Sequence, residues 1–295
     1  MSDEFRSGHV AIVGRPSVGK STLLNRLVGH RISITSRKPQ TTRHRIVGVL
    51  TEPGRQFAFV DTPGFQTRHR SRLNDRLNRT VTTSLADVDV VVLVVDAARL
   101  TDADRAVSAL IPPTLPAIAA VNKVDALAAP RELLPRLAEL ATWRDFAAIV
   151  PVSAEKGVAF DALKDEIARH LPLSPALYDA DTLTDRDERF LAAELIREKI
   201  FRLLGEELPY ATTVTIERFV EEGRLRRIAA VVLVDKAGQR AILLGKGGAT
   251  MKTIATRARE DMEALFGGKV FLEVFVRVRR NWAATDASLA RLGYE

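Results

Sequence analysis

The 295-residue chain contains no cysteine, and its longest apolar stretches, Val88–Ala98 and Leu115–Val121, are short. Without cysteine, a disulfide framework, a zinc site of the cysteine type and thiol chemistry are all excluded. A transmembrane helix is also excluded, because a helix that spans a bilayer needs about 20 apolar residues. The first residues include acids and lack an apolar core, so no secretory signal is predicted. We therefore expect a cytoplasmic protein whose contact with a membrane would at most be peripheral, at the inner face of the plasma membrane.

The net charge and the length of the chain restrict the possible classes of protein further. The chain has 44 Lys and Arg against 37 Asp and Glu, a formal net charge of +7. Such a balance favours a nucleic acid, an anionic membrane surface or a phosphorylated ligand, although an enzyme with a basic surface fits it equally well. Since about 150 residues make one domain, two domains are expected.

The first part of the chain alternates short apolar runs with helical patterns. The runs are rich in Val, Ile and Ala with little polar alternation, as in a parallel sheet that is buried on both faces. The expected strands are His9–Val13, Gln56–Val60, Val88–Val95, Ala117–Val121 and Ala147–Val152. The expected helices are Lys20–Leu27, Leu73–Leu85, Asp102–Ile111, Arg131–Leu140 and Ala159–His170. This order predicts an α/β domain with a mostly parallel sheet and helices on both faces.

The pattern changes after residue 172. Two prolines and a polar stretch within 171–185 predict an interdomain linker. We expect a first domain at 1–172, a linker at 173–185 and a second, smaller α+β domain at 186–295. Its expected elements are a helix at Arg186–Leu204, strands at Ala211–Val220, Arg227–Val234 and Val270–Val278, and a helix that ends at Phe266.

A glycine-rich segment follows the first expected strand and opens the first helix. It matches the phosphate-loop pattern G-x-x-x-x-G-K-[ST], whose backbone N–H groups surround phosphate oxygens at a helix N-terminus. Lys20 is expected to reach the terminal phosphates, and Ser21 to offer its hydroxyl to Mg²⁺. The predicted phosphate-binding residues are Gly14, Arg15, Pro16, Ser17, Val18, Gly19, Lys20, Ser21 and Thr22.

A second motif, DTPG, follows the next strand and comprises Asp61, Thr62, Pro63 and Gly64. Asp61 at a strand end suits a carboxylate that holds Mg²⁺ through water, and Gly64 suits a backbone N–H that meets the γ-phosphate. In isolation D-x-x-G is usually just a turn. Its position after a phosphate loop favours the nucleotide role.

Two further motifs predict guanine recognition. In NKVD, which comprises Asn122, Lys123, Val124 and Asp125, the last carboxylate can accept both the N1–H and N2–H₂ donors of guanine. Adenine would leave that carboxylate unpaired, which disfavours an ATP-dependent kinase. Lys123 would cover the base with its aliphatic stem, and Asn122 would tie this loop to the phosphate loop. In SAEKG, from Ser153, a backbone N–H near Ala154 would meet the base carbonyl O6.

Together these motifs resemble the translation-factor class of P-loop GTPases, and residues 33–48 resemble the first switch of the Era family. In such switches a threonine hydroxyl completes the Mg²⁺ shell when GTP is bound. Thr41 and Thr42 are both candidates, and alignment with the TTR pattern favours Thr42. The resemblance implies GTP and GDP as ligands, Mg²⁺ held by Ser21, Thr42 and Asp61, and catalysis that involves Lys20, Thr42 and Gly64.

Two residues depart from related GTPases. Phe65 stands where Ras-type enzymes place a water-orienting Gln, so hydrolysis cannot use that group. Ser17 stands where Era-like proteins commonly carry the Asn that helps to hold K⁺, so we expect slow intrinsic hydrolysis with weak stimulation by K⁺. The polar and basic segment 65–78 is expected to be the second switch, although a solvated loop would look the same.

The second domain contains a G-x-x-G loop of Gly245, Lys246, Gly247 and Gly248. In KH domains this loop clamps about four nucleotides of a single strand, whereas in isolation the pattern often marks only a helical corner. The preceding strand pair, the following basic helix and the basic end of the chain favour a KH domain. The cations expected beside its groove are Lys252, Lys269, Arg277, Arg279 and Arg280. A solvated strand face is the other interpretation of the last strand, and Trp282 could pack or stack on a base.

Residues 184–201 and 205–219 resemble the helix-first (type II) KH domain of Era, so the resemblance covers nearly the whole chain. It implies a GTP-controlled protein, expected to be a monomer, that binds 16S ribosomal RNA near its 3′ end and assists 30S subunit assembly. An alternative is a signalling or cell-cycle GTPase with a protein or membrane partner, whose KH domain is only a scaffold.

Overall fold

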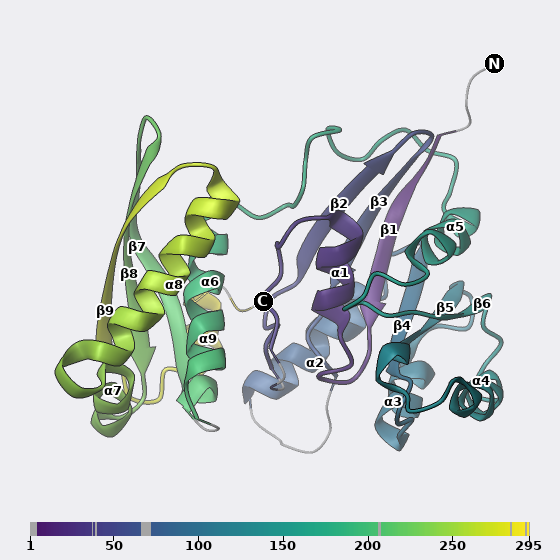
Figure 1. Cartoon of the computed structure of the whole chain (residues 1–295), viewed down its shortest axis with the longest axis horizontal. Coiled ribbons are helices and arrows are strands. Elements are labelled where there is room, and N and C mark those ends of the chain that lie inside the picture. Colours follow the sequence, from purple (N-terminus) through teal and green to yellow (C-terminus); the bar gives the residue numbers. More distant parts are fainter. Residues whose placement is uncertain are drawn as a thin grey trace. The chain divides into compact units, whose positions relative to one another are not determined.

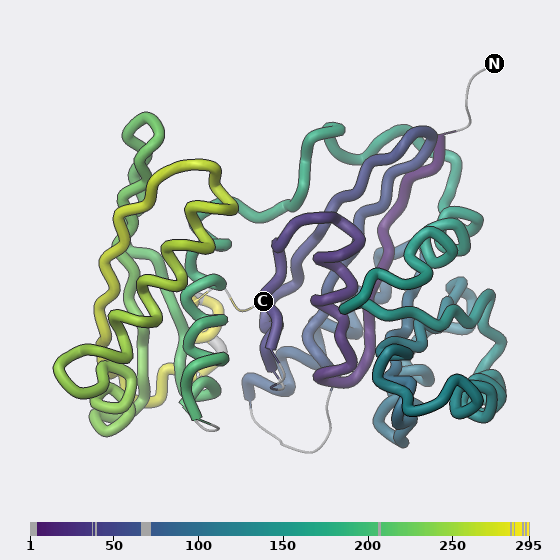
Figure 2. Tube along the Cα trace, viewed as in Figure 1, coloured from purple at the N-terminus to yellow at the C-terminus, as the bar shows by residue number. Residues whose placement is uncertain are grey.

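The computed structural model describes residues 5–36, 38, 40–65, 72–205, 208–283, 285–292 and 294. The chain forms two compact units, which divide between Asp185 and Arg186. Figures 1 and 2 trace both units in sequence colours. Within the described residues, no helix is long and apolar enough to cross a membrane.

The first unit is built on a six-stranded sheet in the order β2-β3-β1-β4-β5-β6. The strands are β1 Arg6–Val13, β2 Ile46–Glu52, β3 Arg55–Asp61, β4 Val90–Asp96, β5 Ala117–Asn122 and β6 Ala148–Pro151. All neighbours pair in parallel except β2, which is antiparallel to β3. The central strands are almost entirely buried, which explains why their sequences are apolar without alternation.

Helices cover both faces of this sheet, so the predicted α/β architecture is confirmed. The helices are α1 Lys20–Val28, α2 Arg72–Ser84, α3 Asp102–Leu110, α4 Leu133–Ala141 and α5 Phe160–His170, with short 3₁₀ turns at Val124–Ala126 and Pro130–Glu132. Val81, Val107 and Leu140 join α2, α3 and α4 to one core cluster with alternate strand residues. α1 and α5 pack on the other face, and Figure 1 shows α1 in front of the sheet and α2 behind it.

Strand β2 is absent from the expected elements, because its first residues lie in the segment that resembles the first switch. The segment expected to be a linker adds to the free edge of this strand. Val49 N donates to Leu183 O at 2.9 Å, and Val47 N donates to Asp185 Oδ1 at 2.9 Å. Gln56, which is fully buried, also binds the backbone at residues 177 and 178. Residues 177–185 are therefore fastened to the first unit rather than free of it.

The second unit has a three-stranded sheet in the order β7-β8-β9, with β8 antiparallel to β7 and parallel to β9. Its elements are α6 Glu188–Leu203, β7 Thr212–Glu222, β8 Leu225–Val234, α7 Ala237–Leu244, α8 Ala249–Phe266, β9 Lys269–Val278 and α9 Asp286–Arg291, with 3₁₀ turns at Leu208–Ala211 and Lys246–Gly248. Apolar residues of α6, α7 and α8 share one core with β8 and β9. The helix-first α+β arrangement is the one expected.

Candidate functional site

The phosphate loop joins β1 to α1 and has a backbone that requires glycine. Gly19 has φ +103°, and a Cβ there would lie 2.3 Å from Asn122 Nδ2. The buried Lys20 ammonium donates to the carbonyls of Gly14 and Arg15 at 3.1 and 3.0 Å, which closes the loop around it. Burial lowers the pKa of Lys20 from 10.5 to about 8. A phosphate at this loop would stabilise the charged ammonium.

Three oxygen-bearing side chains meet at the end of β3. Asp61 Oδ2 accepts hydrogen bonds from Ser21 Oγ at 2.8 Å and from Thr42 Oγ1 at 3.4 Å, and the two hydroxyls lie 2.8 Å apart. Ser33, which the sequence patterns did not mark, also donates to Oδ2 at 2.8 Å. Asp61 is fully buried, and burial raises its pKa.

The other carboxylate oxygen of this cluster bears on metal binding. Asp61 Oδ1 is buried and accepts no hydrogen bond from any described residue. A buried, unsatisfied carboxylate oxygen beside two hydroxyls matches the hard oxygen donors that Mg²⁺ prefers. The residues expected to hold Mg²⁺ therefore fit that ion.

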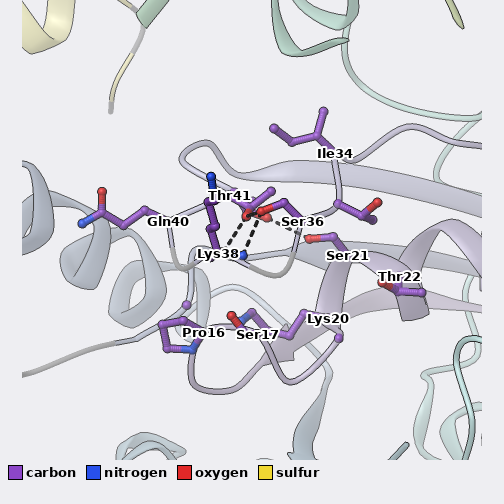
Figure 3. A pocket seen from close by; sticks show the side chains of 14 residues that line it. Pro16, Ser17, Lys20, Ser21, Thr22, Ile34, Ser36, Lys38, Gln40 and Thr41 are labelled. Carbon is purple, nitrogen blue, oxygen red and sulfur yellow. Dashed lines mark hydrogen bonds between the residues drawn. The ribbon is translucent and has the colours of Figure 1, made fainter. Parts of the chain in front are cut away.

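The two adjacent threonines have different surroundings. Thr41 Oγ1 donates to Lys38 O at 2.7 Å and lies 2.9 Å from Ser36 Oγ, so it is held within its own loop. Figure 3 shows this group around Thr41, on the far side of the pocket from the phosphate loop. Thr42 instead faces Ser21 and Asp61. This geometry favours Thr42 over Thr41 as the metal ligand.

Gly64 lines the same pocket as the phosphate loop. A Cβ on Gly64 would lie 2.8 Å from the backbone of Pro16, so only glycine permits this approach. Phe65 N donates to Gly14 O at 3.3 Å, and its ring packs on the core of the sheet. The Phe65 side chain therefore has no polar group to orient water. Of the expected second switch, residues 66–71 lie outside the described residues.

Asn122 connects the base-recognition loops to the phosphate loop, as predicted. Its Nδ2 donates to Val18 O at 2.8 Å, and its Oδ1 accepts from Ala154 N at 2.9 Å. The N–H of Ala154 is thus bonded to Asn122, and the expected contact between a backbone N–H near Ala154 and O6 stays a prediction. Ser153 Oγ donates to Asp125 Oδ1 and orients the carboxylate.

Lys123 also links two parts of the site. Its ammonium donates to Ser17 O at 2.8 Å and to Asp96 Oδ2 at 2.7 Å. The stem of Lys123 is thereby stretched from the base-recognition loop to the phosphate loop. Val124 begins the short 3₁₀ turn that carries Asp125.

A contact to α3 is a further feature that no sequence motif marked. Arg15 Nε donates to Asp104 Oδ2 at 3.0 Å, and Asp104 is fully buried. The same oxygen accepts from Thr101 N and Thr101 Oγ1, which cap α3. The buried carboxylate of Asp104 on α3 therefore supports the phosphate loop through its ion pair with Arg15.

The G-x-x-G loop lies between α7 and α8. Gly245 has φ +72°, and a Cβ there would lie 2.2 Å from Thr250 Oγ1. Gly248 has φ +82° and precedes the first residue of α8. Lys246 and Lys252 are exposed on and just after the loop. The structure therefore brings the loop and its two lysines together.

The cations of β9 lie elsewhere. Val274 and Val276 face the helices, whereas the alternate residue Arg277 is ion-paired with Glu217 of β7. Arg277 is therefore on the sheet face opposite α7 and α8, not beside the G-x-x-G loop as expected. Strand alternation separates it from the loop. Lys269, at the start of β9, is within 3.8 Å of Glu263, and the side chains of Arg279 and Arg280 are exposed.

Trp282 is 3% exposed and donates to Ala211 O, so it packs rather than stacks on a base.

The phosphate loop, the NKVD loop and the G-x-x-G loop define a P-loop GTPase with a C-terminal KH domain. A family model described as "50S ribosome-binding GTPase" matches residues 9–123, and a "KH domain" model matches residues 207–283. GTPase Era of Nitrosomonas eutropha is 52% identical over 99% of this chain and 98% of its own length. GTPase Era of Bordetella pertussis is 54% identical over 99% of each chain. The chain belongs to the GTPase Era family, and it is a GTPase.

Solved structures of Era match both units. One is Era in complex with MgGDPNP and nucleotides 1506–1542 of 16S ribosomal RNA, with a TM-score of 0.94 and 35% identity over 98% of this chain and 99% of that chain. Another is a single-residue variant of Aquifex aeolicus Era bound to GDP·AlF₄⁻, with a TM-score of 0.94 and 34% identity over the same shares.

Proposed function

We propose that this GTPase binds 16S ribosomal RNA near its 3′ end under the control of GTP and assists assembly of the 30S subunit. The observation that carries the proposal is the match, over 98% of the chain, to Era in complex with MgGDPNP and nucleotides 1506–1542 of 16S rRNA. Both loops that such binding needs, the phosphate loop and the G-x-x-G loop, are present in this chain. We expect the protein to act as a cytoplasmic monomer, with at most peripheral contact with the plasma membrane.

Ser21, Thr42 and Asp61 would hold Mg²⁺, which supplies positive charge to the β- and γ-phosphate oxygens. Lys20 would add its ammonium to the same phosphates, and the N–H groups of the phosphate loop and of Gly64 would donate to them. The unsatisfied Oδ1 of Asp61 supports this assignment. GTP and GDP then differ in whether a γ-phosphate holds Thr42 and Gly64 in place.

Asp125 would select guanine by accepting its two adjacent donors. Its position is supported by Ser153, and its loop is tied to the phosphate loop by Asn122. Asp125→Asn should shift preference from guanine to xanthine nucleotides, because xanthine has an acceptor where guanine has an amine. Failure of xanthine nucleotides to rescue the variant would contradict the assignment.

Hydrolysis should be slow and weakly dependent on K⁺. Phe65 cannot orient water, and Ser17 lacks the amide carbonyl that would hold K⁺. The single-turnover rate should change little when K⁺ replaces Na⁺ at fixed ionic strength, and Ser17→Asn should introduce the dependence. A large K⁺ stimulation of the unmodified chain would refute this proposal.

The KH loop would receive the RNA backbone. Gly245, Gly247 and Gly248 leave the backbone open to close approach, and Lys246 and Lys252 supply exposed charge beside it. Lys269, Arg279 and Arg280 would contribute to longer-range attraction of the RNA, and the ion-paired Arg277 should contribute less than expected from the sequence alone.

The test measures affinity for the 3′-terminal segment of 16S rRNA at fixed salt. Replacing Gly245 and Lys246 with Asp should abolish binding and leave GTP hydrolysis unchanged, whereas Arg277→Ala is the matched control and should retain most of the affinity. Unchanged RNA affinity in the loop variant would favour the alternative of a signalling GTPase with a protein or membrane partner.

A further inference from the structure

One contact in the first unit joins the two switch regions directly. Gln40 Nε2 donates to Asn74 Oδ1 at 2.7 Å. Gln40 precedes the two threonines of the first switch and has a left-handed backbone, with φ +57°. Asn74 belongs to α2, lies within the segment 65–78 that is expected to be the second switch, and is only 2% exposed. The nucleotide chemistry described above does not use either side chain.

The segment that carries Gln40 is held together as a hydrogen-bonded turn. Lys38 N donates to Ser36 Oγ at 3.0 Å, and Thr41 Oγ1 donates back to Lys38 O at 2.7 Å. Figure 3 shows that the Gln40 side chain points away from Lys20 and Ser17, although Gln40 is one of the residues that line the pocket. Gln40, which contacts α2, is therefore separated by only one residue from Thr42 at the proposed metal site.

A left-handed conformation at a residue other than glycine costs about 1 kcal/mol or more and persists only when its surroundings maintain it. The hydrogen bond to Asn74 is such a surrounding contact, because Asn74 is buried and a hydrogen bond to a buried group helps to hold its partner in place. Displacing the turn would break this bond, so the position of Thr42 and the position of α2 depend on each other.

We propose that Gln40 and Asn74 are a pair of positioning residues that couples the first switch to α2 and holds Thr42 ready for the Mg²⁺–GTP state. The inference rests on the proposed role of Thr42 as a metal ligand. GDP lacks the γ-phosphate and depends on the phosphate loop and the NKVD loop. The pair should therefore act on GTP binding and hydrolysis and not on GDP binding.

The test uses Gln40→Ala, Asn74→Ala and the double variant of the full chain. Affinity for a non-hydrolysable GTP analogue should fall about 3- to 10-fold in either single variant, as expected for one hydrogen bond with a buried partner, and no further in the double variant. Affinity for GDP should stay within about 2-fold, since GDP binding does not need Thr42 in place. Asn74→Asp, which retains an oxygen acceptor, should restore much of the GTP-analogue affinity.

Two controls make the outcome unambiguous. Arg79→Ala, on the exposed side of α2, should leave both affinities unchanged. Thr42→Ala should weaken the GTP analogue and its Mg²⁺ dependence; if it does not, the proposed metal site fails. Suppose that Thr42→Ala has that effect. The coupling proposal is then overturned if the Gln40 and Asn74 variants bind the analogue normally, or if they lose as much affinity for GDP as for the analogue.

Discussion

Replacing Asn122 with Ala should remove the hydrogen bonds that join the base-recognition loops to the phosphate loop. The side chain is 1% exposed and fills both of its hydrogen-bonding roles, as a donor to Val18 O and as an acceptor from Ala154 N. Truncation would leave one carbonyl and one N–H unpaired in a buried region. Each unpaired group costs about 1–3 kcal/mol, and entry of water recovers part of that cost. We expect a loss of about 2–4 kcal/mol in the free energy of unfolding.

The assay is urea unfolding of the nucleotide-free protein, followed by measurement of GDP affinity. Because the base-recognition loop would no longer be tied to the phosphate loop, GDP should also bind at least about 10-fold more weakly, which corresponds to about 1.4 kcal/mol. Lys156→Ala, an exposed change in the SAEKG loop, should stay within about 0.5 kcal/mol of the unmodified chain. An Asn122→Ala variant with unchanged stability and GDP affinity would refute the reasoning.

Three further predictions concern other contacts. The pKa of Lys20 is lowered to about 8 from 10.5, so between these pH values the unfolded chain binds more protons than the folded chain. The burial of Lys20 therefore costs most below pH 8, and the free energy of unfolding rises as pH increases toward 10.5. In urea unfolding of the nucleotide-free protein, the stability advantage of Lys20→Met over the unmodified chain should shrink by roughly 3 kcal/mol over that range, and a constant advantage would contradict the assignment. A double-mutant cycle of Arg15→Gln and Asp104→Asn should give a coupling energy of about 1.5–3 kcal/mol in the free energy of unfolding. Additive effects would show that the Arg15–Asp104 ion pair contributes nothing to stability. Trp282→Phe should cost about 1 kcal/mol through the lost hydrogen bond to Ala211 and leave RNA affinity unchanged, whereas weaker RNA binding would indicate a stacking role.

The elements around the phosphate site could be predicted because local and global signals agree there. The strand before Gly14 and the helix from Lys20 follow from a buried apolar run, a glycine turn and a helical period, and each is local in the sequence. The proximity of Ser21 and Asp61 follows from parallel topology, because the carboxyl ends of neighbouring strands lie at one edge of the sheet.

Strand β2 is missing from the expected strands although its signal is local: it forms a hairpin with β3 through a two-residue turn, with Glu52 paired to Arg55. The other parts that could not be predicted depend on contacts between distant segments. The segment at 177–185 has a linker composition, yet it is fastened by Gln56 and by the edge of β2, which no local pattern reveals. Ser33 and Asp104 likewise reach the site through packing rather than through a motif.

Arg277 illustrates a different limit. Counting cations at the end of the chain placed it beside the KH groove, whereas the alternation of β9 places it with Phe275 on the opposite face. The same alternation is visible in the sequence, since aliphatic residues occupy every second position from Val270 to Val278 and charged or aromatic residues stand between them. Applying the two-residue period to the charges as well as to the core would have separated Arg277 from the G-x-x-G loop.

The proposal of GTP-controlled binding to ribosomal RNA is tested most directly by crosslinking the full chain to RNA and sequencing the bound fragments, once with a GTP analogue and once with GDP. We expect crosslinks concentrated near the 3′ end of 16S rRNA with the GTP analogue and markedly fewer with GDP. Crosslinks spread without enrichment over unrelated RNA, or equal in the two nucleotide states, would contradict it.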